Sequence, residues 1–108
     1  MNLSEELSGS FKFGEIIEYS PGSVVSKTII KKPSGTITLF SFEKGEGLSE
    51  HKAPFDALVQ ILEGEAEIIL DGKINKVNAG SAIFLPADIP HALKANEKFK
   101  MLLTMIRS

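Results

Sequence analysis

Cysteine is absent from this chain of 108 residues. A disulfide framework, a thiolate metal site and a cysteine nucleophile are therefore excluded. An excess of basic charge is absent as well, because 12 Lys and Arg stand against 14 Asp and Glu for a net charge of -2. Nothing in this balance predicts binding to nucleic acid or to an anionic lipid surface.

Long apolar stretches are also missing. No run approaches the ~20 residues that a membrane-spanning helix needs. The first residues, Met1 to Leu7, lack the basic start and apolar stretch of a signal peptide. We therefore expect a soluble, cytoplasmic protein with neither nucleic-acid nor membrane partners. The length predicts one domain over residues 1–108, with no room for a second core.

Helical periodicity is scarce. Only residues 2–7 indicate a short helical turn, in which Asn2 and Glu5 have capping-box spacing. Beyond them, short β-rich runs alternate with turn signals such as Asp71-Gly72. The predicted strands cover residues 15–19, 23–30, 36–42, 57–62, 66–70, 74–77, 81–85 and 99–106. Many short strands at this spacing predict an all-β sandwich or barrel.

Histidine occurs only as His51 and His91. Each lies among turns and strand-like residues, so a small barrel could bring both imidazoles to one mouth. The spacing of Gly80, Pro86 and His91 resembles the second conserved motif of the cupin superfamily, Gly-x5-Pro-x-Gly-x2-His-x3-Asn. Asp88 stands where that motif has its second glycine.

The chain resembles the small single-domain cupins over about residues 35–106, with residues 1–14 as an N-terminal extension. The resemblance implies an all-β fold, the cupin double-stranded β-helix or jelly-roll barrel, with at most a short helical turn before it. It also implies a homodimer formed through N-terminal strands. The early strand carries apolar residues that fit such a contact: Val24, Val25, Ile29 and Ile30. The alternative is that both faces of this strand are buried within one chain.

The first cupin motif, a Gly followed by His-x-His, a Glu and a later Gly, is incomplete here. Counted back from Gly64, the position of its Glu holds Ala57, and counted on from His51, the position of its second His holds Ala53. Of the four positions that bind metal in cupins, the resemblance therefore leaves only His51 and His91. Catalytic metal sites use at least three protein ligands, so two imidazoles alone predict weak binding.

Two alternatives for the metal stay open. Either one divalent ion (Zn, Ni, Fe, Mn or Cu) is bound by His51 and His91 with further ligands, or no metal is bound. Asp56 is a candidate third ligand, but strand alternation points Asp56 and Gln60 away from the cavity if the strand has begun there. Asp56 also fits a structural role, as an acceptor for backbone N–H groups in the turn.

The two alanines remove charge from the cavity and add volume. We therefore predict a mostly apolar pocket with imidazoles at one end, lined by Ala53, Ala57, Val59, Phe84 and Met101. The favoured function is binding of a small, partly apolar ligand. A metal-dependent enzyme of dioxygenase, isomerase or decarboxylase type, with an unseen third ligand, is the second hypothesis, and a purely structural dimeric barrel is the third. Cupins host many chemistries on one barrel, so the fold alone names no substrate.

Overall fold

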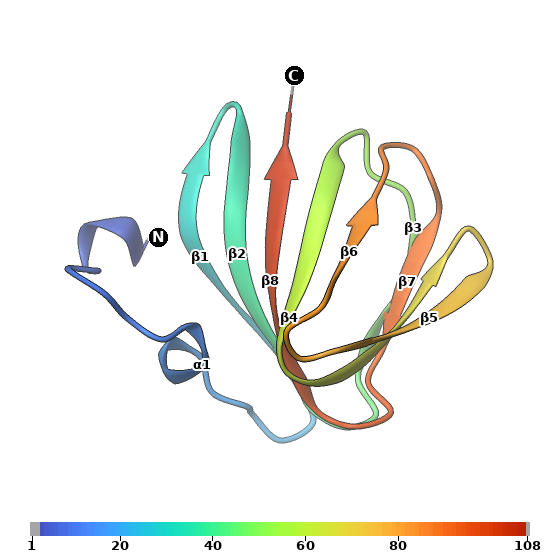
Figure 1. Cartoon of the computed structure of the whole chain (residues 1–108), viewed down its shortest axis with the longest axis horizontal. Helices are drawn as coiled ribbons and strands as arrows, with labels where there is room; N and C mark the ends of the chain where they lie inside the picture. The colour runs from blue at the N-terminus through green and yellow to red at the C-terminus, as the bar shows by residue number, and fades with distance from the viewer. Residues whose placement is uncertain (1–2, 108) are drawn as a thin grey trace.

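The structure, a computed structural model, describes residues 3–107. A 3-10 turn, η1 (Leu3–Glu5), and a one-turn helix, α1 (Phe13–Ile16), precede the strands, and Asn2 of the predicted capping box lies outside the described residues. The strands are β1 (Val24–Lys32), β2 (Gly35–Phe42), β3 (Gly47–His51), β4 (Asp56–Leu70), β5 (Lys73–Asn78), β6 (Ala82–Leu85), β7 (His91–Lys94) and β8 (Phe99–Ile106). All strand pairs are antiparallel and the sheet curls on itself, so the predicted all-β barrel class is confirmed (Figure 1).

Strand β4 joins the two halves of the barrel. Its first half pairs with β6 and β8, and its second half pairs with β5 and β7. The register against β8 slips between Ile61 and Glu63, and the next residue, Gly64, has a φ of 77°. Glycine adopts positive φ without the Cβ penalty of other residues, and such a bulge bends the strand. The strands predicted over 57–62 and 66–70 are therefore one bent strand.

Alternate residues of the strands fill the barrel. In β4, Val59 and Ile61 are fully or almost fully buried, whereas the alternating residues Leu58 and Gln60 are exposed. The centre of the core is aromatic, because the rings of Phe42 and Phe99 stack with centroids 4.5 Å apart. This period of two confirms the predicted alternation and identifies the inner face of each strand.

Residues 15–19 were predicted as a strand, and this prediction is wrong. The segment forms the end of α1 and an extended stretch that pairs with no strand. It lies on the outer face of the sheet, where Ile17 is fully buried against Leu39 and Leu102. Ile16 and Ile17 gave this segment its strand-like composition, but they pack onto the face of the sheet and do not add a strand to it.

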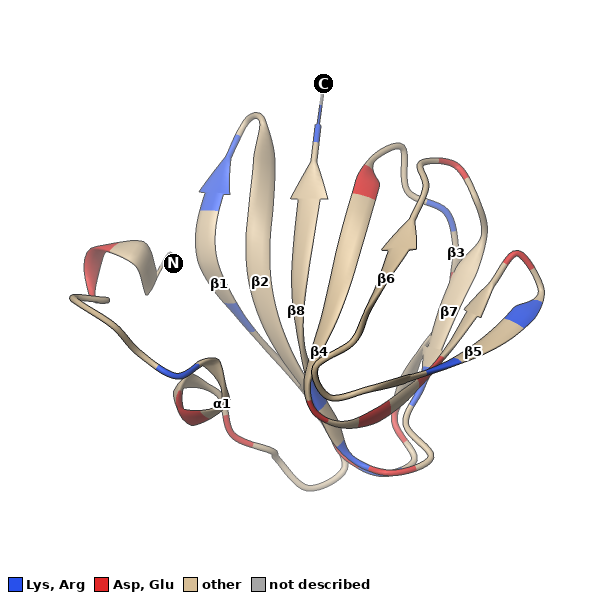
Figure 2. Ribbon diagram, viewed as in Figure 1, with Lys and Arg blue, Asp and Glu red and all other residues tan. Residues whose placement is uncertain are grey.

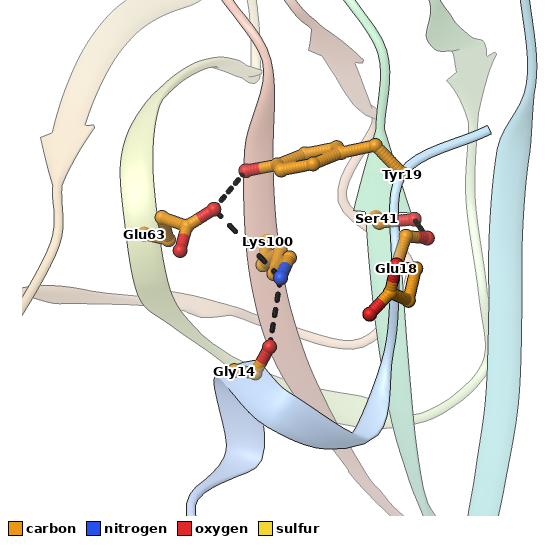
Figure 3. Close-up of polar contacts among 6 residues, drawn as sticks. All are labelled: Gly14, Glu18, Tyr19, Ser41, Glu63 and Lys100. Atoms are coloured by element: carbon orange, nitrogen blue, oxygen red, sulfur yellow. Dashed lines mark hydrogen bonds and ion pairs between the residues drawn. The ribbon is translucent and has the colours of Figure 1, made fainter. Parts of the chain in front are cut away.

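A cluster of polar contacts holds residues 13–19, the N-terminal cover of the sheet, in place (Figure 3). Lys100 Nζ donates to the carbonyl oxygen of Gly14 at 2.7 Å and lies 3.8 Å from the carboxylate of Glu63. The Tyr19 hydroxyl donates to the same carboxylate at 2.5 Å. Burial, followed by the hydrogen bond to Glu63 and the charges of Glu63 and Glu43, raises the pKa of Tyr19. The phenol is therefore neutral at ordinary pH and acts as a donor.

Strands β3 and β7 were not predicted from the sequence. Both are short, and β3 is polar, with four of its five residues exposed. Figure 2 shows that acidic residues gather along the bent middle part of β4, whereas β2 and β6 carry no acidic or basic residue. Among residues 3–107, no helix has the length and apolar character needed to cross a membrane.

Candidate functional site

The two histidines meet on neighbouring strands. His51 ends β3, His91 begins β7, and the two residues are register partners. Their rings lie edge to face with centroids 4.4 Å apart. His91 is 7% exposed, whereas His51 is exposed. The structure thus brings together the two imidazoles that the sequence singled out, one buried and one open to solvent.

A β-bulge in β3 places His51 opposite His91. Leu48 pairs with Leu93, and the next register pair is His51 with His91, so three positions on β3 span two positions on β7. In a regular antiparallel ladder, Glu50 would occupy the place opposite His91. The extra residue therefore exchanges a carboxylate for an imidazole beside the buried histidine.

Both imidazoles are oriented by backbone carbonyls. His51 Nδ1 lies 2.8 Å from the carbonyl oxygen of Ser49, and His91 Nδ1 lies 3.2 Å from that of Ile89. A carbonyl oxygen only accepts hydrogen bonds, so Nδ1 is the protonated nitrogen in each ring. In a neutral ring the lone pair is then on Nε2, which is left to accept a proton, a hydrogen bond or a metal ion.

The two rings differ in their electrostatic surroundings. Desolvation by burial lowers the pKa of His91, the hydrogen bond to the Ile89 carbonyl raises it in part, and the nearby charge of His51 lowers it further. The net direction is downward from the usual 6.5. His91 is therefore neutral at physiological pH and presents Nε2 as an acceptor.

The loop between β6 and β7 holds His91 in position. Asp88 has a φ of 64°, and its N–H donates to the carbonyl oxygen of Ala53 at 2.8 Å. This left-handed conformation explains why the corresponding position in the cupin motif is usually glycine. The N–H of Ala87 donates to Asp56 Oδ1 at 2.9 Å, so Asp56 accepts a backbone hydrogen bond as predicted, but from the distant β6–β7 loop and not from its own turn.

The donor set does not fit a tightly held metal ion. Within residues 3–107, no three side chains of His, Cys, Asp or Glu are grouped so that they could hold one. Asp56 begins β4 one position before the buried Ala57 and is exposed, as strand alternation predicted. Its carboxylate is engaged by the loop and is not part of a group with the two imidazoles.

The predicted pocket residues lie in different surroundings. Ala57, Val59 and Met101 point inward and belong to the main core, where Val59 and Met101 are 0% and 1% exposed. Ala53 is half-buried in the connection between β3 and β4. Of these four residues, Ala53 is the one bonded directly to the loop that orients His91.

Phe84 is a correction to the predicted pocket. Its side chain is 52% exposed, and it pairs with Leu58 on the outer face of the sheet. The inward position of β6 belongs to the following residue, Leu85, which is 2% exposed and pairs with Ala57. The error was one residue in strand alternation, because an apolar run of four residues does not reveal which of its members face the core.

A hollow of about 400 Å³ lies between the β4–β5 hairpin and the β6–β7 loop that precedes His91. Its lining combines apolar and polar side chains: Leu70, Asp71, Lys73, Asn75, Pro86 and Ile89. Leu70 is the register partner of His91 on β4. Sequence reasoning missed Lys73 and Asn75, although their alternation with the buried Val77 could have placed them on the inner face.

Comparisons with known proteins agree with this architecture. Residues 38–107 match the family model described as the cupin domain. The chain is similar to a conserved protein of unknown function from Streptococcus pyogenes, with 35% identity, a TM-score of 0.90 and coverage of 94% of this chain and 90% of that one. It is also similar to a cupin 2 conserved barrel domain protein from Leptotrichia buccalis, with 48% identity and a TM-score of 0.87, over 90% of this chain but 47% of that chain.

One curated relative is longer than this chain. The polyketide synthase CurC of Streptomyces cyaneus is 27% identical over 73 residues, which cover 67% of this chain and 47% of that protein. The chain thus spans about half the length of the curated relative it matches.

Proposed function

Because the chain belongs to the cupin domain family, we propose that it is a barrel that binds a small, partly apolar molecule oriented by His51 and His91. The observation that carries the proposal is the pair of fixed tautomers. Each Nδ1 donates to a backbone carbonyl oxygen, so each Nε2 is available as an acceptor. The matching group on a ligand is a hydrogen-bond donor such as a hydroxyl or an N–H.

The composition of the site supports binding rather than catalysis on a metal. Ala53 and Ala57 stand at two positions where cupins usually have ligands, and an alanine side chain has no donor atom. Among the described residues, no third His, Cys, Asp or Glu is grouped with the two imidazoles. The imidazoles alone supply half of a usual ligand set. In the hollow between the β4–β5 hairpin and the β6–β7 loop, the apolar side chains of Leu70, Pro86 and Ile89 suit the body of a small organic molecule.

The alternative is a metal-dependent cupin enzyme of dioxygenase, isomerase or decarboxylase type. One observation favours it: an imidazole that binds metal through Nε2 usually donates its Nδ1–H to a carbonyl or carboxylate oxygen, as both histidines do here to backbone carbonyls. A third protein ligand is what this function lacks among the described residues.

We propose in addition that the chain forms a homodimer. Among residues 3–107, strand β1 pairs only with β2, which leaves its other edge without a strand partner there. Val25 and Ile29 of this strand pack under the N-terminal cover, which accounts for part of its apolar surface within one chain. The outer face of the sheet still exposes Leu58, Phe84 and Ile106. Sedimentation velocity tests the assembly: a single monomeric species at micromolar concentration contradicts it.

Thermal shift against a library of small alcohols, hydroxy acids and amides tests the binding function. A ligand at about 100 times its Kd stabilises the folded state by about 2.7 kcal/mol, or several degrees of Tm in a domain of this size. We expect at least one such shift, lost in His91→Ala and retained in Gln60→Ala, an exposed control on the outer face. No shift with any compound, or a shift that survives His91→Ala, contradicts the proposal.

A further inference from the structure

The two histidines belong to a row of side chains that crosses the inner face of four strands. His51 on β3 pairs with His91 on β7, His91 pairs with Leu70 on β4, and Leu70 pairs with Lys73 on β5. Register partners in antiparallel strands point to the same face, with Cα atoms about 5 Å apart. Lys73 is therefore about 10 Å from His91 along the row, with Leu70 between them.

The inward direction of Lys73 follows from its strand. Val77, four residues later on β5, is 6% exposed and packs in the main core, whereas Ile74 is 60% exposed. Lys73 and Asn75 share the face of Val77, and both line the hollow of about 400 Å³. A cationic side chain thus faces the concave side of the barrel, in the same row as the histidines.

The polar groups that line the hollow comprise one cation and several hydrogen-bond acceptors. Lys73 is the cation of its lining, and it has no ion pair with any carboxylate in residues 3–107. Asn75 Nδ2 is already bonded to the carbonyl oxygens of Lys73 and Ile68, at 3.1 and 3.5 Å, which leaves Oδ1 to accept. The Asp71 carboxylate accepts as well.

Apolar walls complete the hollow. Leu70 forms one side, and Pro86 and Ile89 of the β6–β7 loop form the other. The carbonyl of Ile89 orients His91, and the carbonyl of the neighbouring Pro90 accepts from the N–H of Asp71 at 2.8 Å. The same loop therefore fixes the histidine, closes the hollow and ties it to the β4–β5 hairpin.

We infer that this hollow binds small carboxylic acids that carry a hydrogen-bond donor beside an apolar body. Lys73 matches the carboxylate, the surrounding acceptors match a hydroxyl or an ammonium group, and Leu70, Pro86 and Ile89 match the hydrocarbon. The inference rests on the proposed binding function, because Leu70, which lines the hollow, is the register partner of His91, and it adds the charge and chemical class of the ligand.

The test uses three acids with the same carbon skeleton: 2-hydroxyisovalerate, valine and isovalerate. Each is titrated into the ¹⁵N-labelled full chain, and amide shifts of the β4–β5 hairpin and the β6–β7 loop are followed. We expect 2-hydroxyisovalerate or valine to bind, with the tighter of the two identifying the donor as hydroxyl or ammonium. Isovalerate lacks the donor and should bind about tenfold more weakly, the effect of one hydrogen bond in a partly open site.

Two lysine variants on the same strand separate the site from general charge. Lys73→Met keeps most of the stem and should weaken binding of the acid by about tenfold or more. Lys76→Met is the control, because Lys76 is exposed, pairs with Glu67 and alternates onto the outer face. Its affinity should equal that of the unmodified chain. The amide spectrum of each variant confirms that it is folded.

Three results overturn the inference: unchanged affinity in folded Lys73→Met, equal affinity for isovalerate, or no saturable shift in the hollow with any of the acids. The neutral diol 3-methylbutane-1,2-diol separates this failure from failure of the proposed function. If the diol binds and requires His91 while the acids do not require Lys73, the carboxylate site is wrong and the binding barrel stands. If neither the diol nor the acids bind, and the wider library gives no shift, both are wrong.

Discussion

Alanine at Gly64 should destabilise the barrel far more than alanine at Gly72. Both glycines have nearly the same positive φ, 77° and 78°. A Cβ on Gly64 would lie 2.3 Å from the carbonyl oxygen of Lys98 and 3.1 Å from two atoms of Phe99. A Cβ on Gly72, in the β4–β5 hairpin turn, would meet no atom within 4 Å. The pair separates steric clash from backbone strain.

The expected magnitudes follow from these two terms. A left-handed conformation costs an L-residue roughly 1–2 kcal/mol, and this is the whole expected cost of Gly72→Ala. Gly64→Ala adds a displacement of packed backbone, and overpacking in a core typically costs about 1–3 kcal/mol more. We therefore expect about 2–5 kcal/mol for Gly64→Ala, a large part of the roughly 5–15 kcal/mol available to a small domain.

A third variant isolates the clash by itself. Gly35 lacks a positive φ, yet its Cβ would lie 2.3 Å from the carbonyl oxygen of Met105. Gly35→Ala should therefore cost more than Gly72→Ala despite its ordinary backbone. Urea unfolding followed by circular dichroism gives the free energies of unfolding. Equal losses for Gly64→Ala and Gly72→Ala would refute the idea that close approach of β8 to the β4 bend requires glycine.

Three further predictions concern the histidine, the N-terminal cover and the metal positions. The pKa of His91 is lower in the folded chain than in the unfolded chain, so on acidification the unfolded chain binds the proton first. The free energy of unfolding should therefore fall as pH drops below about 6.5, by at most about 1.4 kcal/mol per pH unit. The His91→Gln variant should lack this pH dependence, and a pH profile identical to that of the unmodified chain would contradict the prediction. Ser41 is fully buried and donates to the Glu18 carbonyl oxygen at 2.8 Å, so Ser41→Ala should lower the free energy of unfolding by about 1 kcal/mol, and no change in urea unfolding would show that this bond does not hold the cover. The double variant Ala53→His with Ala57→Glu should bind Zn²⁺ at least tenfold more tightly than the unmodified chain in calorimetry, and failure in a folded double variant would mean that the alignment of the first motif is wrong.

The sequence predicted the fold class because alternation and turn chemistry agree over most of the chain. Asp71 and Gly72 both have positive φ, as a tight hairpin requires, and they join β4 to β5. The motif spacing also indicated the sharp turn before His91, where Asp88 takes the conformation usual for glycine. These features are local, so a single sequence contains them.

Other features depended on tertiary contacts that no local pattern records. The bulge that sets His51 opposite His91 is a property of the β3–β7 register, and β3 is too polar to be predicted as a strand. Residues 15–19 have the composition of a strand, but they pack on the outer face of the sheet. Only that tertiary packing shows that they cover the sheet and do not form one of its strands. Lys73 lies in the same row of side chains as the histidines because it pairs with Leu70, and Leu70 pairs with His91.

The metal content of the protein tests the central claim most directly, which is that His51 and His91 orient an organic ligand and do not form a complete metal centre. The measurement is elemental analysis of the untagged protein, purified without chelators or metal columns, alongside His51→Ala and His91→Ala. We predict far less than one equivalent of Zn, Ni, Fe, Mn or Cu, unchanged in either variant. One equivalent of a divalent metal that disappears in both folded variants would contradict the account.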